Sequence, residues 1–288
     1  MSEDQENILG SAPPFLRASS VPAHRRPITI SNRNAGVAGS VTDENFQKAF
    51  LEVPKCNVFS AKELKEKLDG ACTILQNSNA DWDKRVNALK LLRAMLVGGA
   101  MDFTDFTSEL REMESAFLTS IKDLRSQVCR EGCVTIAFFC EKLELKMALL
   151  LEALMPTLIG LLQNSAKVMA TSAQVALQYA VKYVRSPKLL PHLKTAMASK
   201  SKEIRRNSAS LILMAMTLWD NRIIEKNISL FVDCIKAGIY DADLETRNTS
   251  RNIFSHLDQE YHQHAEILFK SLDPSKQRAL SGFVSQSS

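Results

Sequence analysis

Histidine and cysteine side chains are the residues of this chain best suited to metal binding or nucleophilic chemistry, and they gather in two places. His262 and His264 lie near the C-terminal end with His256 close by, and Cys129 and Cys133 are four residues apart. Helical residues two apart point in different directions, and no cysteine or carboxylate completes a tetrahedral set beside the histidines. The sequence therefore predicts no metal site. We expect Cys129 and Cys133 to share one helix face as a buried thiol pair.

Glycine-rich turns that could hold a phosphate or a nucleophile are also missing. The segment "VGGAMD" (97–102) has neither the GxGxxG nor the GK[ST] pattern, and no nucleophile elbow occurs. The sequence thus predicts a non-enzymatic protein with no metal and no cofactor. Its function must then lie in binding, and the next step is to find which helices and turns present the binding residues.

The composition indicates an all-helical protein of a reducing compartment. Of the 288 residues 45% are apolar but only 7% aromatic, and the six cysteines form no CxxC pair. The formal charge of +4 comes from 36 basic and 32 acidic residues, too even a balance for a protein that coats nucleic acid. The acidic start "MSEDQENILG" is no secretory leader, and the apolar stretch 143–162 contains charges and Pro156. We expect a cytoplasmic chain that does not insert into membranes.

Residues 1–41 and the remainder of the chain differ in pattern. The first segment mixes Pro, Ser, Gly and Arg without an apolar period, so we expect a disordered tail. "TDENFQKAFLEV" then predicts a helix that begins at a Thr/Asp cap and ends before Pro54. Beyond it, helices alternate with short polar breaks.

These helices recur as pairs. When the second helix of each pair is aligned, Ala88, Val128, Ala173, Ala209 and Ser250 fall at intervals of 40, 45, 36 and 41 residues. A period near 40 with two helices per unit is typical of HEAT repeats, and Pro156 and Pro191 lie 35 apart where a first helix of this class is kinked. We expect six repeats over 42–284, at 60–99, 102–144, 147–185, 188–220, 222–258 and 260–285, the last with a short second helix.

The turns inside the pairs are charged. Lysine stands at or near the start of the second helix, where the helix dipole disfavours a cation; the residues are Lys84, Lys122, Lys167, Lys200 and Lys202. Arg85, Arg125, Arg206 and Arg247 are aligned at one repeat position. Two interpretations stay open for the arginines, which either form an internal Asp/Arg ladder or join the lysines in facing an acidic partner.

Trp82, in "NADWDKRVNAL", is an aromatic residue in charged company at a helix start. It either folds back over Leu75 or Leu89 or faces outward as an interface anchor. Trp219 closes the apolar helix "SASLILMAMTLW", and we expect it in the core.

The segments "DWDKRVNALKLLRAML", "KDLRSQVCREGC", "QNSAKVMATS", "SKSKEIRR" and "GIYDADLETRNTSR" resemble the second TOG domain of the CLASP family of microtubule-associated proteins. With "DENFQKAFLEVP", the resemblance covers roughly residues 42–284. It implies an all-α solenoid of six HEAT repeats, with an extra N-terminal helix over 43–51, whose within-pair turns contact tubulin.

Carried over by position, the resemblance assigns one set of tubulin-binding residues to each turn. They are Trp82 and Lys84 in the first turn, Lys122 and Arg125 in the second, Lys167 in the third, Lys200, Lys202 and Arg206 in the fourth, and Arg247 in the fifth. A full CLASP resembles several TOG domains joined by basic linkers, whereas this sequence holds one. A short relative, an isoform and a fragment all stay open.

The tail carries one further candidate. Ser19, Ser20, Val21 and Pro22 resemble the Ser-x-Ile-Pro motif that binds end-binding proteins, with valine losing one methylene of burial, about 0.8 kcal/mol. A plain linker and a phosphorylation site after Arg17 are the alternatives.

The sequence therefore predicts a monomeric tubulin- or microtubule-binding protein of the CLASP type. By resemblance it regulates microtubule dynamics through stabilisation, rescue and catastrophe suppression, at microtubules of the cytoskeleton, including plus ends, spindle, kinetochore or centrosome. The alternative is a HEAT adaptor for another protein, which gains if Trp82 packs inward and the lysines scatter.

Overall fold

The computed structural model describes residues 39–287, and this part of the chain is helical without strands. A short helix α1 (Asp43–Leu51) comes first. Six helix pairs follow it: α2 (Ala61–Gln76) with α3 (Trp82–Val97), α5 (Glu114–Ile121) with α6 (Ser126–Leu143), α7 (Ala148–Leu161) with α8 (Lys167–Tyr179), α9 (Leu190–Met197) with α10 (Lys202–Leu218), α12 (Ile228–Ile239) with α13 (Leu244–Glu260), and α14 (His262–Lys270) with α15 (Pro274–Ser287).

Shorter elements join these pairs. They are the 3-10 turns η1 (Ala100–Asp102), η2 (Glu144–Met147) and η4 (Pro187–Leu189), the π-helical turn η3 (Ala180–Val184) that extends α8, and the helices α4 (Phe106–Glu112) and α11 (Asn221–Lys226). None of the described helices is long and apolar enough to cross a bilayer.

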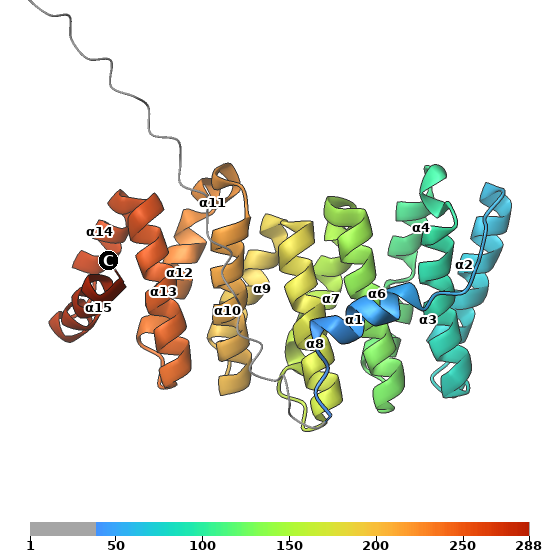
Figure 1. Cartoon of the computed structure of the whole chain (residues 1–288), viewed down its shortest axis with the longest axis horizontal. Helices are drawn as coiled ribbons and strands as arrows, with labels where there is room; N and C mark the ends of the chain where they lie inside the picture. Colours follow the sequence, from blue (N-terminus) through green and yellow to red (C-terminus); the bar gives the residue numbers. More distant parts are fainter. Residues whose placement is uncertain (1–38, 288) are drawn as a thin grey trace, which may run out of the picture. The chain divides into compact units, whose positions relative to one another are not determined.

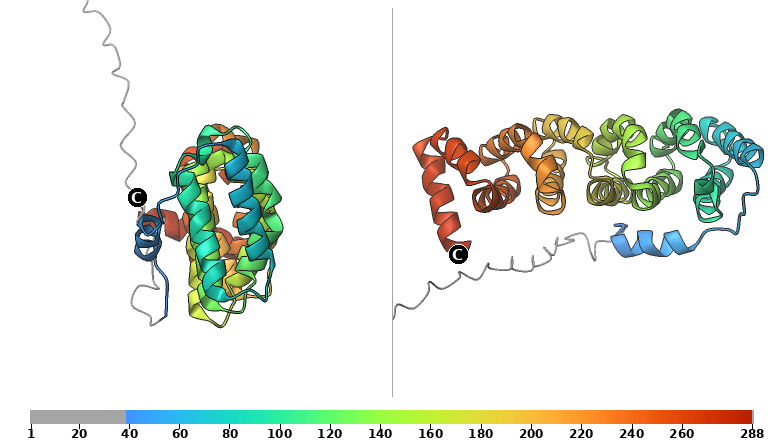
Figure 2. Two further views of the ribbon diagram at one scale, coloured as in Figure 1. Left: turned by 90° about the vertical axis from the view of Figure 1, so that its right-hand side faces the viewer. Right: turned by 90° about the horizontal axis from the view of Figure 1, so that it is seen from above.

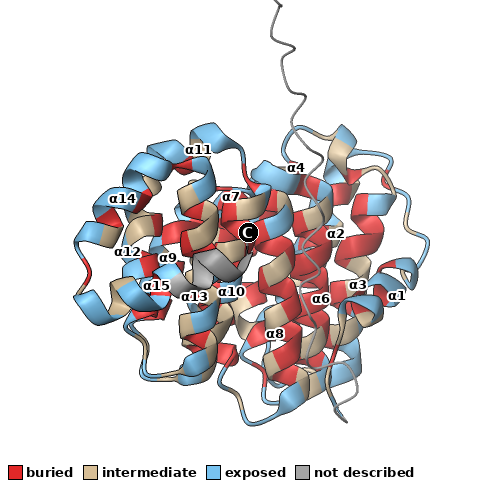
Figure 3. Cartoon of the chain, turned by 60° about the vertical axis from the view of Figure 1, so that its left-hand side comes forward, coloured by how far each residue is buried: buried red, intermediate tan, exposed pale blue. Residues whose placement is uncertain are grey.

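The pairs of residues 61–287 stand side by side in sequence order (Figure 1). Seen from above, the first helices of the first five pairs form one layer and their second helices form the other, while the C-terminal helix α15 runs across them (Figure 2). The buried residues lie mainly along the helices, and the turns at the helix ends are mostly exposed (Figure 3). The predicted all-α solenoid with an additional N-terminal helix is confirmed.

Helix α1 crosses the outer side of the second-helix layer (Figure 2). Thr42 caps its start, and the backbone N–H of Thr42 donates to Asn45 Oδ1 at 2.9 Å, as the Thr/Asp cap predicts. Phe50 packs its ring 5.2 Å from that of Phe138 on α6 and 5.5 Å from that of Tyr179 on α8. The expected tail, residues 1–41, lies outside the described residues up to position 38, while Val41 is buried and donates its N–H to Thr171 Oγ1 at 2.9 Å.

The aligned small residues need a correction. Counted from the helix starts, the small residue is the seventh of each second helix; the five are Ala88, Gly132, Ala173, Ser208 and Ser250, all buried. Val128 is one helical turn too early and Ala209 one residue too late. The position is small because the paired helices touch there: a Cβ on Gly132 would lie 3.1 Å from Ile121 Cγ2, and one on Gly238 would lie 1.8 Å from Ser250 Oγ.

Of three further expectations, the one for Trp219 is confirmed, while those for Pro191 and for the last helix pair need correction. Trp219 is 1% exposed and donates its indole N–H to the Val181 carbonyl at 2.7 Å, so its core position is confirmed. Pro156 lies inside α7, but Pro191 stands in the first turn of α9, where proline interrupts no helical hydrogen bond. The last second helix is not short, because α15 has 14 residues and its partner α14 has nine.

Candidate functional site

The turns inside the first five helix pairs follow one another along one edge of the solenoid, the lower edge in Figure 1. We call them turns 1 to 5, and together with the first residues of the following helices they make up the turn edge. They comprise residues 77–81, 122–125, 162–166, 198–201 and 240–243. The connections between pairs, including α4 and α11, lie at the opposite edge.

Trp82 is the first residue of α3 and is 46% exposed. A core position for Trp82, which the inward interpretation expected, is therefore excluded. Asp81 precedes the helix and Asp83 lies in its first turn, where carboxylates suit the positive end of the helix dipole. Two acidic neighbours thus stabilise the helix start while the indole stays partly in solvent.

The predicted lysines are all exposed on this edge. Lys84 lies 3.4 Å from Asp81, a surface pair that contributes little to stability. The other four have no carboxylate within 4.0 Å in the described part of the chain; they are Lys122, Lys167, Lys200 and Lys202. Lys167 and Lys202 each begin a second helix, and the first turn of α8 contains no acidic residue that would offset Lys167.

Three exposed apolar residues on the same edge were missed by the sequence reasoning. Leu124 in turn 2 is 95% exposed, Leu244 at the start of α13 is 59% exposed, and Tyr240 opens turn 5. Leu124 and Leu244 each stand between two charged residues, the signal that singled out Trp82, and could have been found in the same way, whereas Tyr240 has a charged neighbour on one side only. The first residues of these five second helices are thus Trp82, Ser126, Lys167, Lys202 and Leu244, apolar at the two ends and basic in α8 and α10.

The arginines of the turn edge make internal contacts. Arg85 is fully buried, pairs with Asp123 and donates to the Leu75 carbonyl at 3.2 Å. Arg125 bonds to Asp123 through Nε at 3.0 Å and to the Ser78 carbonyl through Nη2 at 2.8 Å. The ladder interpretation is therefore confirmed for turns 1 and 2.

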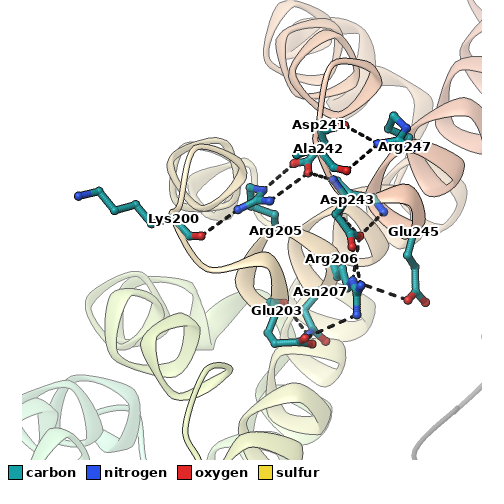
Figure 4. A network of polar contacts seen from close by, with 11 residues as sticks. Lys200, Glu203, Arg205, Arg206, Asn207, Asp241, Ala242, Asp243, Glu245 and Arg247 are labelled. Carbon is teal, nitrogen blue, oxygen red and sulfur yellow. Dashed lines mark hydrogen bonds and ion pairs between the residues drawn. The ribbon is translucent and has the colours of Figure 1, made fainter.

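Turns 4 and 5 have a denser network (Figure 4). Arg205 donates to both carboxylate oxygens of Asp241, at 2.6 and 3.1 Å, and Arg206 does the same to Asp243, at 2.8 and 2.5 Å. Arg247 donates to the carbonyls of Asp241 and Ala242 at 2.9 and 2.7 Å. Hydrogen bonding by Arg206 lowers the pKa of Asp243, and that by Asp243 raises the pKa of Arg206.

The helix starts also correct the arginine alignment. Arg85, Arg205 and Arg247 are the fourth residues of α3, α10 and α13. Arg206 follows that position by one residue, and Arg125 precedes α6 altogether. The prediction that Arg85, Arg125, Arg206 and Arg247 share one repeat position is thus wrong for two of them, Arg125 and Arg206.

The histidines and cysteines that could do chemistry form no exposed cluster on this edge. Cys129 and Cys133 are both buried, as expected, and Cys129 Sγ donates to the Ile121 carbonyl at 3.2 Å. His262 pairs with Asp258 at 2.8 Å, and within the described residues no group of three His, Cys, Asp or Glu side chains could hold a metal ion.

Comparison with known proteins now bears on this edge. The family model described as CLASP N terminal matches residues 64–281. The CLIP-associating protein 1-A of Xenopus laevis is 36% identical over 250 residues, which are 87% of this chain and 17% of that protein. The CLIP-associating protein of Drosophila melanogaster is 37% identical over 265 residues, which are 91% of this chain and 18% of that protein.

The chain belongs to the CLASP family. It spans less than a fifth of the length of these two relatives. Among solved structures, that of Crescerin, which uses a TOG domain array to regulate microtubules in the primary cilium, matches with a TM-score of 0.56 at 11% identity, over 83% of this chain and 92% of that one. The described part of this CLASP-family chain therefore has the fold of a TOG domain.

The fold places all nine predicted contact residues of this CLASP-family chain on or beside the turn edge, in two classes. Trp82 and the five lysines are exposed. Arg125, Arg206 and Arg247 are only partly exposed and are engaged with carboxylates or carbonyls of the chain itself. The motif at Ser19, Ser20, Val21 and Pro22 lies outside the described residues.

Proposed function

We propose that this chain is a non-enzymatic protein that binds tubulin or the microtubule lattice through the turn edge. The observation that carries the proposal is the row of exposed side chains along that edge, with lysines at turns 1 to 4 and apolar residues at turns 1, 2 and 5, in a member of the CLASP family. The apolar residues supply anchors that lose water on binding, and the lysines attract an acidic partner surface.

By this proposal the chain regulates microtubule dynamics by stabilisation, rescue or suppression of catastrophe. It acts in the cytoplasm on the microtubule cytoskeleton, including plus ends and spindle structures. We further propose that it binds as a monomer, and that the tail residues Ser19, Ser20, Val21 and Pro22 bind end-binding proteins. The sequence alone supports these last two points.

The alternative is an adaptor for a protein other than tubulin. It gains support if Trp82 packs inward and the lysines scatter. Trp82 is instead exposed at one end of the edge, and the five lysines lie at turns 1 to 4 of that same edge. The tubulin interface therefore has more support than the adaptor.

The deciding experiment compares free tubulin with stabilised microtubules. The purified chain is mixed with each at low ionic strength, and comigration on a sizing column and co-sedimentation are measured. We expect binding to at least one form, weakening steeply as ionic strength passes about 0.15 M because exposed lysines act through a screened field. Absence of binding to both forms at low salt contradicts the proposal, and salt-insensitive binding points to another surface.

A further inference from the structure

The five turns differ in how they are held. Turn 2 reaches back to turn 1 through one buried carboxylate, Asp123, which pairs with Arg85 and accepts from Arg125. Arg125 then spans to the carbonyls of Ser78 at 2.8 Å and Ala80 at 3.4 Å. These two carbonyls come just before Trp82, so the hydrogen bonds from Arg125 fix the backbone that presents the indole.

Turns 4 and 5 are joined in a parallel way (Figure 4). The Arg205 guanidinium donates to the turn 4 carbonyls of Ser199 and Lys200, at 2.8 and 3.1 Å, and to the turn 5 carboxylate of Asp241. Asp241 Oδ1 also accepts the N–H of Asp243 at 2.7 Å, just before Leu244. One arginine thus links the backbone that carries Lys200 to the backbone that carries Leu244.

Turn 3 has no such link. The helix position of Arg85 and Arg205 is occupied in α8 by Ala170. The turn's own side-chain bond is local, from the Ala166 N–H to Asn164 Oδ1 at 2.8 Å. Within residues 39–281, no ion pair joins turn 3 to turn 2 or to turn 4.

From these contacts we infer that the turn edge consists of two preorganised half-sites, turns 1 and 2 and turns 4 and 5, with turn 3 coupled to neither. Arg125 is the positioning residue of the first half-site and Arg205 that of the second. The inference rests on the proposed tubulin-binding function and describes how the turn edge is organised for it. Holding each pair of turns in its bound geometry lowers the entropy lost when a partner binds.

The donor inventory of the two arginines supports a positioning role over direct contact. A guanidinium has five N–H donors. Arg125 uses Nε, Nη1 and Nη2 on Asp123, Ala80 and Ser78, and Arg205 uses the same three nitrogens on Asp241, Ser199 and Lys200. Little hydrogen-bonding capacity remains for an acidic partner.

Double-mutant cycles on tubulin affinity test the inference. Trp82→Ala, Arg125→Gln and Arg205→Gln are made singly and in pairs, with thermal unfolding and circular dichroism as folding controls. We expect Trp82→Ala and Arg125→Gln to be non-additive, the double variant binding at least about threefold more tightly than the product of the single effects predicts. The separate losses of tubulin affinity caused by Trp82→Ala and by Arg205→Gln should multiply in the double variant. Equal coupling in both cycles, or none in either, overturns the inference.

A conservative variant separates positioning from contact. Arg125→Lys keeps the charge but loses the fork that bridges Asp123 and the two carbonyls. We expect it to bind as weakly as Arg125→Gln, with an unchanged dependence on salt. If Arg125→Lys keeps the affinity of the unmodified chain, Arg125 is a direct contact and the inference is wrong.

A spectroscopic readout keeps the test independent of tubulin. With 5-fluorotryptophan the chain gives two fluorine resonances, and Trp82→Ala identifies the one that belongs to Trp82. Arg125→Gln should shift and narrow that resonance as the indole gains mobility, whereas Arg205→Gln should leave it unchanged. If tubulin binding fails but this selective change occurs, the proposed function is wrong and the half-site organisation stands; no selective change overturns the organisation itself.

Discussion

Trp82 and Leu244 occupy the same position in two repeats, because each is the first residue of a second helix, and each is about half exposed. Between them the equivalent positions hold Ser126, Lys167 and Lys202. Both ends of the turn edge therefore offer apolar surface, as Leu124 does in turn 2, while turns 3 and 4 offer positive charge.

Loss of either apolar end should weaken tubulin binding. We expect Trp82→Ala to cost about 2 kcal/mol or more, as for an anchor that becomes fully buried, and Leu244→Ala to cost about 1 kcal/mol because its side chain is smaller. Affinity is measured by titration against fluorescent tubulin. Leu145→Ala is the matched control, since Leu145 is 64% exposed in η2 between two pairs. Equal losses for Leu145→Ala and Leu244→Ala would show that position on the edge does not matter.

The helix pairs could be predicted from sequence and the exposure of Trp82 could be raised as one of two alternatives, because both follow from local pattern. A period near 40 residues identifies the pairs, and charged neighbours at a helix start favour an exposed indole. The start of α6 could not be placed so well. Arg125 looks like the arginines inside the other helices, but Asp123 holds it just before the helix.

Contacts between repeats decide what the sequence leaves open. Asp123 is buried because it meets Arg85, 38 residues away, and Leu124 next to it is therefore turned outward. Arg205 looks like one of two equivalent arginines in "EIRR", yet only its position matches Arg85 and Arg247. Contacts with partners in other repeats decide which arginine links two turns and which apolar residue is exposed. No local sequence pattern specifies those partners.

Tyr179 should control the docking of α1. Its hydroxyl donates to Asp43 Oδ1 at 2.6 Å and accepts from Gln47 Nε2. Tyr179→Phe should loosen α1 by about 1 kcal/mol, seen as faster amide exchange over residues 43–51 with little change elsewhere. Tyr183→Phe is the control, because its ring lies 5.4 Å from that of Tyr179. Unchanged exchange in α1 would mean that its phenylalanines alone hold it.

The same contact makes α1 sensitive to alkali. Burial and the nearby Asp43 raise the pKa of Tyr179 above its ordinary value of 10.0. A raised pKa in the folded state means that the neutral phenol is stabilised, so its contribution is complete below pH 10 and declines above it. We therefore expect exchange in α1 to rise above pH 10 beyond the ordinary base-catalysed rate. Tyr179→Phe should remove that extra rise.

Asp243 provides a test of the turn 4 and turn 5 network in acid. Hydrogen bonding by Arg206 is the main cause that lowers its pKa, so its stabilising contribution is present above the ordinary value of 3.8 and is lost only in stronger acid. Arg206→Gln should move the pKa of Asp243 up toward the ordinary value, measured from carboxyl carbon shifts. Asp273 is the internal control, because the Ser275 hydroxyl lowers its pKa to about 2 without Arg206. An unmoved Asp243 would mean that its bonds to Thr246 suffice.

Lys167 should show opposite effects on stability and on binding. It is the first residue of α8, where a cation opposes the helix dipole and no acidic residue stands in the first turn. Lys167→Glu should therefore raise the free energy of unfolding by about 0.3–1 kcal/mol at low salt, yet weaken tubulin binding, because it places a negative charge against an acidic partner. Denaturant unfolding and tubulin titration measure the two effects. Lys62→Glu is the control: Lys62 lies in the first turn of α2, at the opposite edge, and its replacement should leave binding unchanged. Tighter or equal binding by Lys167→Glu would remove turn 3 from the interface.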